Sequence, residues 1–304
     1  MEQNATLTKD KKGAINVSTF SQKIHSYLKH PFSLLVWIIT ILAALLTAAS
    51  FVYLVLYILI KGVPYLRPKL FSWTYDSNNV SMLPSIINTF LLTALSLVIS
   101  VPLGIFAAIY MVEYAKKGNR IVKFIRVTAE TLSGIPSIVY GLFGMIFFVG
   151  VLKMQLSLLS GSLTVAIMVL PTIMRTTEEA LLSVPQSYRE GSFGLGAGKL
   201  RTVFRIVLPS AVPGILSGVI LATGRIVGET AALIYTAGTM AKVPNNLFAS
   251  ARTLSVHMYL LSNEGLHTNE AFATAVVLLV FVMLINMLAN FVARRLSAKN
   301  AEND

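Results

Sequence analysis

Apolar residues gather along this chain in six long runs, without the strict alternation that is typical of half-buried strands. Each run is close to the roughly 20 residues that a helix needs to cross the hydrocarbon core of a bilayer. The runs cover residues 33–60, 86–112, 132–152, 156–174, 211–235 and 271–292. The pattern predicts an all-α membrane protein with a six-helix transmembrane domain over 33–292, a polar tail over 1–32 and a short tail over 293–304.

The composition of the 304 residues supports this class and excludes several others. Hydrophobic residues make up 55% and charged residues only 12%, against roughly 25% charged residues in an ordinary soluble domain. The chain has no cysteine, which excludes disulfide scaffolds, zinc–thiolate sites, iron–sulfur clusters and a cysteine nucleophile. It also lacks the H-E-x-x-H and G-x-S-x-G motifs, so metalloprotease or serine-hydrolase chemistry is not expected.

The net charge of +12 fits a membrane topology better than a nucleic-acid partner, which would require basic residues on one soluble face. Of the 25 lysines and arginines, 18 lie in the two tails and in the loops 113–130 and 175–209, and 6 lie in the alternate loops. Positive residues accumulate on the cytoplasmic side of membrane proteins. Both termini are therefore predicted to be cytoplasmic.

Two charged residues, Arg225 and Glu229, fall inside the fifth run. Charges within a membrane are costly and usually face the bundle interior or a water-filled cavity. Four residues apart on one helix, the two would share a face, either as a mutually neutralised structural pair or as a polar patch on a solute path. Arg175, at the end of the fourth run, is either an interfacial residue or a further charge on that path. Because a guanidinium donates two parallel hydrogen bonds to an oxyanion, arginines on the path would favour an anionic solute.

The loop over 175–209 begins with a helix-start pattern. Ser183 is the predicted N-cap, Pro185 falls in the first turn, and Gln186 follows three residues after the serine. Gly196 and Gly198 then predict a bend. The loop therefore predicts a short helix outside the membrane, followed by a break.

A second short helix is predicted after the bend, because apolar positions recur at helical spacing up to Pro209, which is expected to end it. The apolar positions are Leu200, Val203, Phe204 and Val207. The glycine-rich run over 194–200 lacks the first glycine and the Ser/Thr of a phosphate-binding loop, so this chain is not expected to bind ATP itself. Periodicity alone leaves two interpretations open, a helix resting on lipid headgroups or a helix that docks on a partner.

This loop resembles the signature loop of the permease subunits of ABC importers, which reads EAA, three residues, glycine, nine residues and I-x-L-P. The residues in the signature positions are Glu190, Gly191, Ser192, Gly196, Ile206, Leu208 and Pro209. The departure is Gly191–Ser192 in place of Ala-Ala, and both replacements are small. The resemblance implies the six-helix bundle of a type I ABC importer permease. Its short helix, with Pro185 and Tyr188, would sit in a groove of an ATPase subunit.

Four further stretches resemble the A-type permease family of phosphate-specific importers. They cover residues 101–110 with Glu113 and Tyr114, 134–144, 170–175 and 225–233. The resemblance implies a multi-pass permease of the bacterial cell membrane and places Arg175, Arg225 and Glu229 on the phosphate path. It also implies three kinds of partner: a homologous C-type permease, two ATPase subunits that hold the ATP and magnesium, and an extracellular phosphate-binding protein.

Two alternative functions remain at this point. The solute could be another oxyanion, such as sulfate or molybdate, because the arginines separate phosphate from these only by resemblance. A channel or a secondary transporter would need no ATPase, but the complete loop signature argues against this class. The outer loop over 236–270 is expected to contain a short interfacial helix, either near the outer gate or under the binding protein, or with no further role.

Overall fold

The computed structural model describes residues 31–116 and 118–301, and every regular element within them is a helix. The polar tail predicted over 1–32 lies almost entirely outside the described residues. The described residues divide into two units, with the boundary between Tyr57 and Ile58. The first unit contains most of α2 (Pro31–Gly62), a single apolar helix of 32 residues. The second unit contains all the other helices.

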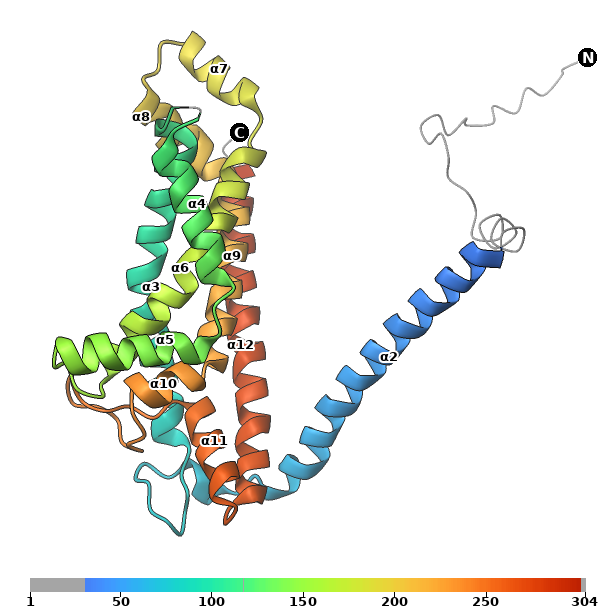
Figure 1. Ribbon diagram of the computed structural model, residues 1–304, viewed down its shortest axis with the longest axis vertical. Helices are drawn as coiled ribbons and strands as arrows, with labels where there is room; N and C mark the ends of the chain where they lie inside the picture. Colours follow the sequence, from blue (N-terminus) through green and yellow to red (C-terminus); the bar gives the residue numbers. More distant parts are fainter. Residues whose placement is uncertain (1–30, 117, 302–304) are drawn as a thin grey trace, which may run out of the picture. The chain divides into compact units, whose positions relative to one another are not determined.

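Four long helices form the framework of the second unit and run side by side in Figure 1. They are α3 (Leu83–Ile109), α6 (Leu158–Ser183), α9 (Leu208–Gly228) and α12 (Thr268–Ala301). Helix α6 lies between α3 and α9, and its side chains Met168, Val169 and Ile173 are fully buried. Helix α6 is therefore the central helix of this unit.

Five helical segments of the described chain are long and apolar enough to cross a membrane, and a sixth is present if one bent pair counts as a single span. The five are residues 32–65, 83–114, 158–183, 199–228 and 268–291. The prediction of an all-α protein with about six spans is therefore confirmed.

The third predicted span is not continuous, and this corrects the prediction over 132–152. Helix α4 (Arg120–Ser133) fills most of the loop expected before it, and α5 (Ser137–Gly144) with the π-helical η4 (Met145–Val151) follows at a bend of 104°. The break lies at 134–136, where Pro136 has no N–H to continue the α4 ladder and restricts the residue before it to extended backbone. Only part of α5 is buried, namely Tyr140, Gly141 and Gly144.

The fifth predicted span, over 211–235, is also broken. Helix α9 ends at Gly228, Glu229 is extended with ψ 128°, and a separate helix α10 (Ala231–Thr236) follows. Arg225 and Glu229 therefore do not share one helix face. The fourth span is longer than predicted, because α6 continues to Ser183 and places Arg175 inside a helix rather than at its end.

Pro209 does not end the helix before it, contrary to the prediction. Helix α8 (Lys199–Thr202) passes through the π-helical η5 (Val203–Val207) directly into α9, so residues 199–228 form one long helical segment. Proline lacks an N–H and crowds the preceding turn of an α-helix. A π-helical segment widens that turn and lets the chain remain helical.

Glycines on α9 set how closely it packs against α6. A Cβ at Gly214 would lie 2.6 Å from Ala180 Cβ, and one at Gly218 would overlap the side chain of Thr176. Nothing lies within 4 Å of a Cβ built at Gly224 or Gly228. Of the two small-residue pairs in α9, only the first therefore brings helices together.

We expect Gly218→Ala to destabilise the permease by about 1–3 kcal/mol, because its methyl group would force α9 away from Thr176. Gly224→Ala is the matched control, since its methyl group meets open space and alanine favours the helix. Thermal unfolding midpoints of the purified, detergent-solubilised variants check this. Equal midpoints for the two variants would contradict the packing described for α6 and α9.

The end of the bundle opposite α7 is closed by α11 (Leu254–Glu264), whose side chains Leu254, Val256 and Leu261 are buried. The short helix expected in this loop exists, but it packs into the protein rather than lying on its surface. His257 is fully buried there, with its Nδ1 atom 3.3 Å from Arg252 Nη1 and its ring edge-on to Tyr75. Burial, and then the charge of Arg252, lower the pKa of His257 to about 3, although the backbone of Val80 opposes them.

Protonation of His257 makes the stability of this end depend on pH. The folded pKa lies below the ordinary value of 6.5, so between about pH 3 and pH 6.5 the unfolded chain binds a proton that the folded chain does not. The stabilisation is complete above about pH 6.5 and is lost as the pH falls below that value. We expect the thermal midpoint to fall on acidification, and His257→Gln to have a flatter profile between about pH 4.5 and pH 6.5. Identical profiles would exclude His257 as the source.

Candidate functional site

The connection between α6 and α9 contains the predicted pair of short helices. Helix α7 (Gln186–Gly194) starts after Pro185, which is its N-cap residue, and Val184 before it is extended. Ser183 is the last residue of α6 and donates its hydroxyl to Ala180 O, so it does not cap α7 as predicted. A serine at the end of a helix bonds backward as readily as forward, and the longer α6 decides between the two.

Gly196 makes the bend that separates the two arms of the loop. Its φ of +82° lies in the left-handed region, which suits glycine and closes the end of α7 through the bond from Gly196 N–H to Phe193 O. Across the bend, the hydroxyls of Ser192 in α7 and Thr202 in α8 form a hydrogen bond of 2.8 Å that joins the two helices. Of the two residues that stand in place of Ala-Ala in the signature, Ser192 is buried against α8 and Gly191 is exposed.

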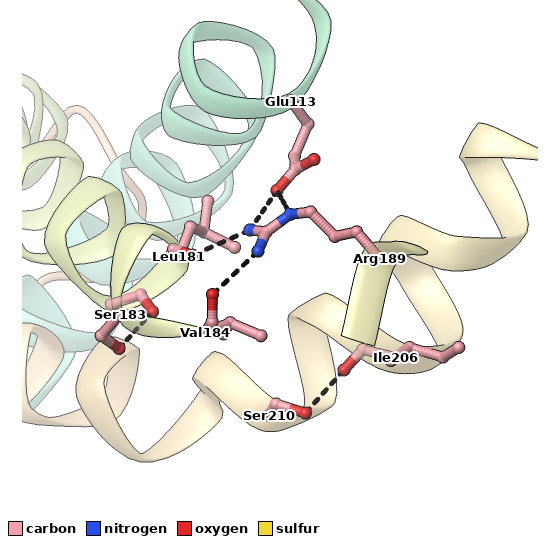
Figure 2. Close-up of polar contacts among 8 residues, drawn as sticks. Glu113, Leu181, Ser183, Val184, Arg189, Ile206 and Ser210 are labelled. Carbon is pink, nitrogen blue, oxygen red and sulfur yellow. Dashed lines mark hydrogen bonds and ion pairs between the residues drawn. The ribbon is translucent and has the colours of Figure 1, made fainter. Parts of the chain in front are cut away.

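Arg189 anchors α7 to the bundle (Figure 2). Its Nη2 atom lies 2.6 Å from Glu113 Oε1 and also donates to Leu181 O, while Nη1 donates to Val184 O. The exposed fractions of the two charged side chains are only 11% and 8%. Breaking such a buried pair from one side costs about 3–5 kcal/mol, because the remaining charge stays buried. One guanidinium thus joins α7, the end of α6 and η3 (Tyr110–Tyr114), the π-helical continuation of α3.

The Arg189–Glu113 pair was not predicted from the sequence. The two residues are 76 positions apart, and in the sequence each counts only as one charge of a loop. The next residue of η3 makes a second contact with the loop, since Lys199 Nζ of α8 lies 5.1 Å from the centre of the Tyr114 ring. Both arms of the loop are therefore held by neighbouring residues of η3.

The other face of the loop is apolar and exposed. Tyr188 is 51% exposed, and Phe193 and Leu195 are exposed beside the bend. Large apolar side chains that gather on a surface mark a site of interaction.

A second polar region is a groove of ≈ 400 Å³ between α4 and α6. Its charged lining forms two ion pairs, Arg126 with Glu178 at 2.5 Å and Arg175 with Glu179 at 3.1 Å, and Glu130 adds a further carboxylate. Arg175 is more than half exposed, so its pair with Glu179 is readily exchanged for another anion.

The predicted path residues occupy separate environments. Arg225 is half-buried near the end of α9 and makes no hydrogen bond or ion pair within the described residues. Glu229 is buried, and its Oε1 accepts the N–H of Ala232 at the start of α10. Glu229 therefore stabilises the break after α9, and the neutralised Arg225–Glu229 pair considered above is not formed.

The sequence matches, over residues 100–301, the family described as binding-protein-dependent transport system inner membrane component. The chain belongs to this family of ABC transporter permeases. A probable ABC transporter permease of Bacillus subtilis, YqgI, is 34% identical over 285 residues, which are 86% of this chain and 95% of YqgI. The phosphate transport system permease protein PstA 1 of Mycobacterium tuberculosis is 35% identical over 205 residues, 65% of this chain and 66% of that protein.

Solved structures of ABC importers share the fold of this permease. A chain of the bacterial alginate ABC transporter superposes with a TM-score of 0.65 at 16% identity, covering 89% of this chain and 98% of its own. A chain of the methionine transporter MetNI superposes with a TM-score of 0.56 at 21% identity, covering 71% and 94%. The protein is thus a multi-pass inner-membrane permease, the non-catalytic membrane component of its transporter.

We expect Gly196→Ala to displace α7, since an alanine at φ +82° is strained by about 1–2 kcal/mol. Displacement should lower transport more than ATP hydrolysis, if α7 transmits ATPase movement. Gly198→Ala is the control, because Gly198 has an ordinary φ of −73° and open space around it. Transport and ATPase rates of the two variants in the purified transporter measure the difference. Normal transport by Gly196→Ala would contradict a role for the bend.

Proposed function

We propose that this permease moves inorganic phosphate into the bacterial cell, driven by ATP hydrolysis in partner subunits. The observation that carries the proposal is the similarity to relatives named as phosphate permeases, at 35% identity over 205 residues. The half-buried Arg225 adds physical support, because its guanidinium has no carboxylate partner among the described residues and keeps its donors for a tetrahedral oxyanion.

The path would run past Arg225 and Arg175. An anion that binds too tightly is not released, so the exchangeable pair of Arg175 with Glu179 suits a transit site. Glu229 contributes indirectly, because its bond to Ala232 N–H keeps the chain non-helical just beyond Arg225. No contact within the described residues joins the two arginines, so a phosphate would meet them one after the other.

The loop over 175–209 would face the cytoplasm and receive the ATPase. Tyr188, Phe193 and Leu195 supply the apolar contact surface, while Arg189 holds the helix from behind. The family's dependence on a binding protein implies an ATPase and an extracellular binding protein as partners. For this chain we propose a phosphate-binding protein, two ATPase subunits and a homologous C-type permease, which would complete the path.

Another oxyanion is the second candidate, because YqgI, which covers more of this chain than the phosphate relatives, is named only as a probable permease. Uptake of labelled phosphate by phosphate-starved cells, with and without this gene, separates the two. Phosphate uptake that depends on the gene and resists competition by sulfate and molybdate supports phosphate. Gene-dependent uptake of sulfate or molybdate, without uptake of phosphate, would overturn the proposal that the solute is phosphate.

Arg225→Ala should lower uptake by roughly 30-fold or more, because the solute loses a desolvated charge partner. Arg67→Ala is the control, since Arg67 is an exposed arginine outside the helical framework. Uptake is normalised to the amount of assembled transporter in the membrane. Near-normal uptake by well-assembled Arg225→Ala would remove Arg225 from the path.

A further inference from the structure

Helix α3 contacts polar partners at both of its ends. At one end its continuation η3 places Glu113 and Tyr114 on the two arms of the loop, against Arg189 of α7 and Lys199 of α8. At the other end Asn88 and Thr89 hold the segment that leads into α11. Figure 1 shows α3 running between these two regions beside α6. Helix α6 also joins them, since it leads into α7 and Leu158 and Leu159 donate to carbonyls of the loop over 237–253.

The contacts at the second end are buried and directional. Asn88 Nδ2 donates to Lys242 O at 2.9 Å and to Arg252 O at 3.1 Å. Thr89 Oγ1 accepts the N–H of Leu254, the first residue of α11, at 2.8 Å. Asn88 and Thr89 are fully buried. These bonds fix the loop over 237–253 and the start of α11 to the first turns of α3.

Between its two ends α3 has no break, and Pro102 is accommodated inside the helix. The helical segment runs over residues 83–114 and packs along α6. Gly104 allows this close approach, since a Cβ there would lie 2.8 Å from Ile173 Cγ2. A packed helix moves as a rigid rod rather than bending freely, so a displacement at Glu113 reaches Asn88 and Thr89.

We propose that α3 is the transmission element of this permease, with the Glu113–Arg189 pair as its input and the Asn88–Thr89 contacts as its output. Movement of α7 on the ATPase would pull η3 through Arg189, and α3 would carry it to α11 and the loop over 237–253. Glu113 and Arg189 are positioning residues and touch no solute. The inference rests on the part of the proposed function that assigns α7 to the ATPase, and does not depend on which anion is moved.

The first test measures how firmly α7 is held to α3. The chain has no cysteine, so spin labels on Phe106→Cys in α3 and Ser187→Cys in α7 are the only labels in this subunit of the assembled transporter. We expect a narrow distance distribution that keeps its width when ATP is added, and a broad one when Glu113→Gln removes the charge. Lys116→Gln, a neighbouring exposed charge, is the control and should leave the width unchanged. An equally narrow distribution in Glu113→Gln would overturn the input contact.

The second test is a double-mutant cycle between the two ends. Thr89→Val keeps the shape of the side chain and removes the acceptor for Leu254 N–H. Glu113→Gln and Thr89→Val should each keep ATP hydrolysis and lower the amount of solute moved per ATP by about tenfold. The double variant should move as much solute per ATP as either single variant, because both substitutions break the same transmission through α3. Multiplied losses in the double variant would overturn the proposal.

Two controls keep the outcomes distinct. If Glu113→Gln does not assemble, Glu113→Asp and Arg189→Lys keep both charges and change only the geometry, and they should show the same loss of coupling. Unaltered coupling in both would also contradict the proposal. If the mobility of the single label on α7 does not respond to the ATPase and ATP when Glu113 is intact, the assignment of α7 to the ATPase fails instead. If the unmodified transporter moves no phosphate, only the assignment of phosphate as the solute fails.

Discussion

The bond between Arg189 and Glu113 is the interaction on which the functional arrangement depends. It is buried in a chain that is otherwise largely apolar, and two further donors of the guanidinium bond to Leu181 O in the last turn of α6 and to Val184 O just after it. Carbonyls at the end of a helix lack the N–H four residues on, so they are open to such a donor. Arg189 therefore donates hydrogen bonds to carbonyls at the end of α6, neutralises the charge of Glu113 and fixes the orientation of α7. That orientation turns Tyr188 and Leu195 outward, where a partner subunit can reach them.

The charged side chains along the chain differ in how firmly they are paired. Glu113 lies near the end of a long apolar helix and is paired at short distance, whereas Arg175 lies on an exposed face and is paired weakly with Glu179. Arg225 is half-buried and unpaired among the described residues. The structural charge is thus held by fixed partners, whereas the two arginines proposed for the solute path keep their donors exchangeable or free.

Much of the fold is predictable from the sequence, because long apolar runs and loop charges carry most of the information. The signature spacing from Glu190 to Pro209 also locates the two arms of the loop and the bend at Gly196. Helix ends inside the membrane are harder to predict. The breaks at 134–136 and at Glu229 fall within apolar runs, and the backbone bond to Ala232 that stabilises the second break is not visible in the sequence. The Arg189–Glu113 contact joins positions 76 apart, and no local pattern pairs them.

The central claim is that α7 is the surface through which an ATPase acts on this permease. Site-specific cross-linking tests it most directly, with a photoreactive residue placed at the exposed Tyr188 and, as a control, at the exposed Phe248 of the opposite end of the bundle. We expect Tyr188 in the intact transporter to cross-link to the ATPase subunit, with a yield that changes when ATP is added. Cross-linking to lipid alone at Tyr188, or to the ATPase only from Phe248, would contradict it.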